Sequence, residues 1–116
     1  MGVLIFDPSE WLIIVEVELE GVRRIRARLV LDTGATAVMI NWRLARILGL
    51  KIDPKRTVKT TTASAVETVP EVIVPKISFL DKSVRNVQTM VKDLPEDSTV
   101  DGLLGLSFLK HFKLSI

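Results

Sequence analysis

The chain has 116 residues, of which 47% are hydrophobic, and a formal net charge of +2. This length and apolar content fit one domain with its own core, so we expect a single domain over residues 1–116. The absence of cysteine excludes disulfide frameworks, thiol catalysis and cysteine-bound zinc, and the small charge excess does not indicate a nucleic-acid partner.

The apolar stretches near the start of the chain are too short for targeting or membrane insertion. Met1–Phe6 ends at Asp7 and Pro8, before a signal-peptide core could form, and the run over residues 11–15 is far shorter than a membrane span. We therefore expect no membrane partner and a cytoplasmic location.

Side-chain amides are scarce, whereas Val, Ile, Lys, Arg and Glu are plentiful. The amides present are Asn41, Asn86 and Gln88. This bias is one that proteins of thermophiles show.

Residues 11–31 alternate between apolar and charged side chains, which predicts two half-buried strands with Gly21 in the turn. A three-residue loop over residues 20–22 would pair Val17 with Ile25, keeping apolar side chains on one face. The same register sets glutamates against the arginines of the second strand. We interpret those arginines as a solvated, salt-bridged face and not as an anion-binding site.

The next segment predicts a strand, a loop, a strand and a helix in succession. The apolar residues 29–31 lead into Asp32-Thr33-Gly34-Ala35-Thr36, and residues 38–40 resume a strand. Asn41 is a good N-cap for a helix over residues 42–48, which Gly49 would end.

The second half of the chain predicts further short strands. Residues 58–74 are rich in Thr and Val and predict a hairpin, with Pro70 and Pro75 as strand breakers. Strands are expected over residues 77–79, 84–91 and 100–104. Ser107 is expected to cap a short helix over residues 108–112. The pattern predicts a mainly β domain with one or two short helices.

Asp32-Thr33-Gly34 is the most informative motif, because it follows a fully apolar strand. A carboxylate placed there requires hydrogen bonds or a proton. The small residues that follow allow backbone amides to approach it and fix its orientation. An ordinary turn is the alternative interpretation of the tripeptide alone.

A second motif lies about seventy residues further on, where Val100-Asp101-Gly102-Leu103-Leu104-Gly105-Leu106 leads into a short helix. With Asp32-Thr33-Gly34-Ala35 and the Thr-rich hairpin, this stretch resembles the retropepsin-like aspartic proteases over most of the chain. The resemblance implies a closed, β-barrel-like acid-protease fold that forms one half of a C₂ homodimer. It also implies a polypeptide substrate and neither a cofactor nor a metal.

The resemblance implies a role for each matching residue. Asp32 would be the catalytic carboxylate, Thr33 would make a hydrogen bond across the dimer, and Gly34 would present its N–H to the carboxylate. Leu103, Leu104 and Gly105 would support the loop from beneath. The substrate-binding residues would be Ala35, Thr36, Thr61, Thr62, Ala63, Ser64 and Ala65.

One Asp per chain suits this chemistry only if two chains combine. One carboxylate must take a proton from water while another protonates the substrate, and two carboxylates about 3 Å apart share a proton; aspartic proteases are a standard example. A chain of this length has no second lobe, so a C₂ dimer would supply the second Asp32.

Three other residues receive simpler interpretations. Asp101 lacks a following Thr and is expected to be structural. His111 is expected on the surface at a helix end, since no second ligand of matching spacing accompanies it. Trp42 is expected to be a packing anchor.

Two features depart from the family pattern. The expected flap tip has no glycine, although family flaps use glycine to open. Residues 113–116 are short for a terminal dimer strand, so either the dimer is built differently or the natural chain continues. These departures leave open a peptide-binding module of the same fold that does not cut, and a processing domain of a larger protein.

Overall fold

The computed structural model describes residues 4–7, 12–61 and 64–112. Helix α1 covers Trp42–Ile47 and helix α2 covers Leu106–Leu109. The strands are β1 (Leu4–Asp7), β2 (Leu12–Glu20), β3 (Arg24–Leu31), β4 (Val38–Ile40), β5 (Thr57–Thr61), β6 (Val66–Phe79), β7 (Lys82–Val91) and β8 (Gly102–Leu104).

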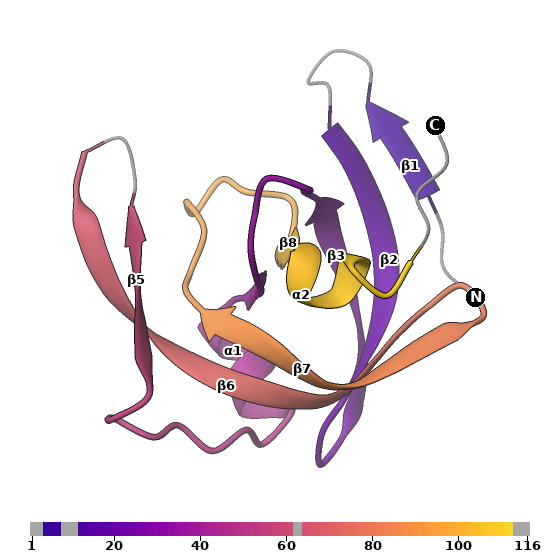
Figure 1. Cartoon of the computed structure of the whole chain (residues 1–116). Helices are drawn as coiled ribbons and strands as arrows, with labels where there is room; N and C mark the ends of the chain where they lie inside the picture. Colours follow the sequence, from indigo (N-terminus) through magenta and orange to yellow (C-terminus); the bar gives the residue numbers. More distant parts are fainter. Residues whose placement is uncertain (1–3, 8–11, 62–63, 113–116) are drawn as a thin grey trace.

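The strands form one sheet in the order β1-β2-β3-β8-β4-β7-β6-β5, and β2 also pairs with β6. This extra pairing closes the sheet on itself, although the result is less regular than a simple barrel. The hairpin of β5 and β6 extends to one side of the closed part (Figure 1). The prediction of a mainly β, closed fold with two short helices is confirmed.

The predicted register of the first hairpin is wrong by two residues. Val17 pairs with Ala27 and not with Ile25, so the loop covers residues 21–23. The cause is a contact distant in sequence, because the N–H of Val22 donates to the carbonyl of Leu48 at the end of α1 (2.9 Å). Because side chains alternate with a period of two, a shift of two residues leaves each side chain on the same face of the sheet. The salt-bridged face is therefore present, with Arg26–Glu16 and Arg24–Glu20 pairs at 3.5 Å.

Helix α1 follows its predicted caps. The side chain of Asn41 accepts a hydrogen bond from the N–H of Leu44 at 2.8 Å. Gly49 adopts φ 66°, the left-handed conformation that glycine reaches without strain, directly after the helix. The helix is buried through Leu44 and Ala45.

The prediction that the prolines break the strand is wrong, because β6 runs through Pro70 and Pro75. The prolines mark positions where its buried face changes. Val69 is buried before Pro70, whereas the even-numbered residues 72 and 74 are buried after it, and the odd-numbered residues 77 and 79 are buried after Pro75. The buried face of β7 also changes across Asn86, which has φ 55°. The β6–β7 ribbon therefore turns a corner between two layers of the closed sheet.

Candidate active site

Asp32 lies at the end of β3, where this strand runs parallel to β8. Leu31 pairs with Leu104, and the N–H of Asp32 donates to the carbonyl of Leu104 at 3.1 Å. The Asp32 side chain is partly exposed. Its Oδ1 accepts a hydrogen bond from the N–H of Gly34 at 2.9 Å, and a Cβ on Gly34 would lie 3.2 Å from that oxygen. A small residue at position 34 therefore lets the backbone hold the carboxylate.

The loop after Asp32 is fixed by the start of α2. The N–H of Leu106 donates to the carbonyl of Ala35 at 2.8 Å, and the N–H of Ser107 donates to the carbonyl of Thr36 at 2.9 Å. Gly105 lies so close to the loop that an added Cβ would be 2.3 Å from the carbonyl oxygen of Ala37. The position therefore requires glycine for close backbone approach.

Ser107 does not cap α2, so the predicted cap is wrong. Gly105 occupies the N-cap position without a side-chain hydrogen bond, and the helix begins at Leu106. The Ser107 hydroxyl instead accepts from the N–H of Val38 (2.9 Å) and donates to the carbonyl of Gln88 (2.7 Å). It thus ties β4 to β7 directly behind the Asp32 loop.

A cleft of about 470 Å³ opens beside this loop, between residues 34–36, the β5–β6 hairpin and the segment after β7. Leu103, Met39 and Met90 lie side by side on β8, β4 and β7 and line the cleft. Methionine side chains adapt to ligands of different shape. The cleft therefore offers an apolar, adaptable surface next to a positioned carboxylate.

The structure brings several predicted site residues together at this cleft. Gly34, Ala35, Thr36 and Thr61 line it. Thr33, Ser64 and Ala65 are exposed to solvent. Thr62 and Ala63 lie outside the described residues. Leu104 and Gly105 lie beneath the loop, whereas Leu103 alternates to the opposite face of β8 and lines the cleft.

Sequence reasoning missed the two methionines and Leu94, which also line the cleft. Met39 lies in an entirely apolar strand, flanked by buried Val38 and Ile40. An entirely apolar strand is typically covered on both sides of the sheet. This pattern could therefore have indicated that one side of the strand lines a binding site.

An ion pair connects the hairpin to the body of the protein. Glu67 on β6 contacts Lys92, the residue after β7, at 2.8 Å. Lys92 also lines the cleft. Further toward the base of the hairpin, Gln88 donates to Glu71 at 2.7 Å. These contacts join residues 17 to 25 positions apart, which periodicity alone does not reveal.

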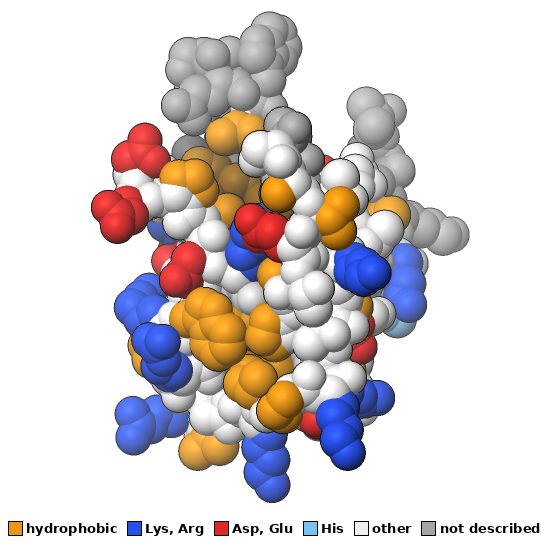
Figure 2. Space-filling model, turned by 90° about the vertical axis from the view of Figure 1, so that its left-hand side faces the viewer, with side chains coloured by type: hydrophobic (Ala, Val, Ile, Leu, Met, Phe, Trp, Pro, Cys, Tyr) orange, Lys and Arg blue, Asp and Glu red, His pale blue; other side chains and the backbone are white. Residues whose placement is uncertain are grey.

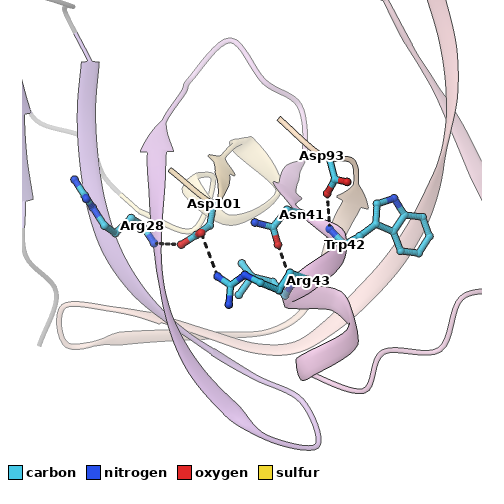
Figure 3. A network of polar contacts seen from close by, with 7 residues as sticks. Arg28, Asn41, Trp42, Arg43, Asp93 and Asp101 are labelled. Carbon is cyan, nitrogen blue, oxygen red and sulfur yellow. Dashed lines mark hydrogen bonds and ion pairs between the residues drawn. The ribbon is translucent and has the colours of Figure 1, made fainter. Parts of the chain in front are cut away.

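The carboxylate of Asp101 lies between Arg28 and Arg43 and contacts both (Figure 3). Its carboxylate accepts from the N–H of Arg28 at 3.0 Å and pairs with the Arg43 guanidinium at 3.4 Å. Its own N–H donates to the carbonyl of Arg28 at 2.7 Å, and its carbonyl accepts from the N–H of Asn41. Asp101 therefore joins β3, β8 and the start of α1.

The described residues include no group of three His, Cys, Asp or Glu side chains placed to hold a metal ion. His111 is exposed, and its carbonyl accepts from the Lys82 ammonium. Neither described helix has the length and apolar character that a membrane crossing requires.

Comparison with known proteins agrees with this geometry. Residues 15–108 match the family model described as aspartyl protease. The crystal structure of a retropepsin-like aspartic protease from Rickettsia conorii superposes with a TM-score of 0.70 at 22% identity, covering 97% of this chain and 89% of that one. No curated protein matches the sequence. Because the family model matches most of its length, the chain belongs to the aspartyl protease family, and its fold is similar to that of the retropepsin-like enzyme.

Proposed function

We propose that the protein is an aspartic endopeptidase that acts as a homodimer, with one Asp32 from each chain. The observation that carries this proposal is that Asp32 belongs to the loop whose residues 34–36 line the cleft. Its carboxylate accepts from the N–H of Gly34, and the loop that bears it is fixed by α2. A carboxylate oriented by the backbone at the edge of an open cleft suits activation of a water molecule.

In the proposed reaction, the ionised Asp32 takes a proton from water while the partner subunit's Asp32, in its protonated form, donates to the carbonyl oxygen of the peptide bond. Water oxygen bonds to the carbonyl carbon and gives a tetrahedral diol. Collapse of the diol breaks the C–N bond: the partner subunit's Asp32, now ionised, takes a proton from a diol hydroxyl, and the proton on Asp32 passes to the leaving amine. One proton shared by two carboxylates is required throughout, so we expect a bell-shaped rate profile on the acidic side of neutrality.

The cleft would hold the substrate as an extended chain. Ala35, Thr36 and Thr61 line it with small or hydroxyl side chains, and Leu103, Met39 and Met90 supply the apolar surface. We expect apolar side chains next to the cut bond. Thr33, which is exposed in the single chain, would make the hydrogen bond to the second chain.

The experiment that tests the proposal is incubation with an unstructured polypeptide at about pH 4 to 6, with and without pepstatin. Asp32→Asn should abolish cleavage with the fold intact. Asp101→Asn is the matched control: it should lower stability, because Asp101 joins three elements, while the folded fraction still cuts. Cleavage by Asp32→Asn at the parent rate would refute the assignment. Binding without cutting by the parent would favour the peptide-binding module.

Dependence on dimerisation has its own readout. Specific activity should fall when the protein is diluted below the dimer dissociation constant, because two half-sites must meet. Sedimentation at the same concentrations supplies the dimer fraction. Constant activity per chain from a species that sediments as a monomer would contradict the shared site.

A further inference from the structure

The chain carries an uneven distribution of charge. Residues 43–59 contain six basic side chains and one acidic side chain, a net charge of +5, whereas the whole chain carries +2. The remaining residues therefore sum to −3. This segment covers most of α1, the connection to β5 and the first half of β5.

Most of these basic side chains lack an acidic partner. Arg43 pairs with Asp101, and Arg46 lies 6.0 Å from the ring centre of Trp42. Five exposed cations form no ion pair with any acid in the described part of the chain, and we call them the basic surface: Arg46, Lys51, Lys55, Arg56 and Lys59. On β3, Arg24 and Arg26 contact glutamates of β2, whereas Arg28 forms no ion pair within the described residues.

The basic surface adjoins both the cleft and a second groove. Lys59 borders the cleft. Lys51 and Arg56 border a groove of about 540 Å³, which Val22 and Ile73 also line. Val22 and Ile73 are 81% and 40% exposed, so apolar surface lies among the cations. On the side of the molecule that bears the hairpin, apolar side chains gather with Lys and Arg around them (Figure 2).

The single acid within the segment does not neutralise this surface. The carboxylate of Asp53 accepts from the backbone N–H of Lys55 at 2.9 Å and forms no ion pair within the described residues. Glu71, which also borders the groove, accepts from Gln88. Both carboxylates keep their negative charge and offset Lys51 and Arg56 within the groove, but the five cations of the basic surface still outnumber these two acids.

We propose that the basic surface is an exosite for an acidic segment of the polypeptide substrate, outside the stretch held in the cleft. This inference rests on the proposed peptidase function. Because Lys59 borders the cleft while Lys51 and Arg56 border the second groove, a polypeptide that leaves the cleft on the Lys59 side would meet the first of these cations at the cleft wall. An acidic segment joined to the cut sequence then binds at high effective concentration. Clustered positive charge also accelerates capture of an acidic chain.

The test uses two peptides with the same cleavable sequence, one extended by four glutamates and one by four glutamines. The extension is attached first to the N-terminus and then to the C-terminus of the cleavable sequence. On at least one of these ends, the glutamate extension should lower KM about tenfold at low salt relative to the glutamine extension, with kcat unchanged. Salt at 0.5 M should remove the difference in KM. The variant with Lys51, Lys55, Arg56 and Lys59 all replaced by Gln should lose the preference. A matched control replaces Arg23, Arg24, Arg26 and Lys110 by Gln. This variant loses the same number of positive charges elsewhere on the protein and should keep the preference for the glutamate peptide.

Fluorescence anisotropy of both peptides on Asp32→Asn measures the exosite without cleavage. Cleavage of the glutamine peptide measures the peptidase function by itself, so the two proposals fail separately. Equal affinity of the two peptides on both ends would overturn the exosite. An equal loss of the glutamate preference in both quadruple variants would also overturn it, because the preference would then depend on the net charge of the protein and not on the basic surface. Loss of binding to anionic vesicles or to RNA in the first variant, without any glutamate preference in the parent, would assign the surface to that partner instead.

Discussion

The two walls of the cleft are held in place in opposite ways. The loop from Asp32 to Val38 is attached at several points along its length to Leu104, Leu106 and Ser107. The hairpin of β5 and β6 is attached at its base, and further along it Glu67 forms an ion pair with Lys92. The loop contacts are short and leave no room for side chains, whereas the hairpin contacts are exposed to solvent.

This difference indicates which wall of the cleft keeps a fixed geometry. The hydrogen bond from the N–H of Val38 to the Ser107 hydroxyl is partly buried and so is protected from competition by water, and the backbone contacts along the loop hold the segment that carries the carboxylate. The ion pair on the hairpin has side chains that are 26% and 45% exposed, so its contribution is small and depends on salt. A fixed loop that carries the carboxylate, opposite a hairpin that is held more weakly, suits an enzyme that must admit a long polypeptide.

Gly105→Ala should have the largest effect. Its Cβ would lie 2.3 Å from the carbonyl oxygen of Ala37 and 2.8 Å from that of Ala35, so the loop must move. We expect a loss of more than about 3 kcal/mol in the free energy of unfolding. Denaturant titration measures it. Ser64→Ala, on the exposed side of the hairpin, is the control and should be nearly neutral; similar losses would contradict the comparison.

Ser107→Ala should have an intermediate effect. It leaves the N–H of Val38 and the carbonyl of Gln88 without their partner, at a cost of about 1–3 kcal/mol. Because Val38 ends the Asp32 loop, kcat should also fall. Ser98→Ala, in an exposed loop, should change neither quantity. A loss of stability with parental kcat in Ser107→Ala would show that the tie does not position the loop.

Glu67→Gln should have the smallest effect on stability, less than about 1 kcal/mol. Removing its contact with Lys92 loosens the hairpin, so KM should rise about two- to threefold at low salt, and the difference should vanish near 1 M salt. Glu96→Gln, in an exposed loop, is the control. A KM difference that persists at high salt would mean that the pair acts by shape and not by charge.

Local patterns predicted the elements better than their connections. Alternation located β2 and β3, and Asn41 and Gly49 marked α1, because caps and periodicity are local properties. The register of the first hairpin failed because Leu48, which holds its turn, is far away in sequence. Ser107 was predicted to be a cap because capping is the usual role of Ser before an apolar helix. Its hydroxyl instead forms hydrogen bonds with the backbone of β4 and of β7.

The site was predicted in part for the same reason. Asp32 and Gly34 are neighbours in sequence, so their contact follows from the motif. Met39, Met90 and Leu103 become neighbours only when β8, β4 and β7 align. The basic surface was overlooked because its cations are spread over the fourteen residues 46–59, while the β3 arginines occupy alternate positions and form an obvious pattern.

The path of β6 has a consequence for how the strand opens to solvent. Its residues before Pro70 pair with β5 alone, and those after it pair with β7 and, near the end, with β2. The two prolines carry no amide hydrogen, so they separate the strand into three stretches in a hydrogen-exchange experiment. The amides of residues 66–69 should exchange through fraying of the hairpin, while those of Val72, Val74 and Ile77 should exchange only with global unfolding. A single continuous strand would then show both the lowest and the highest protection in the sheet.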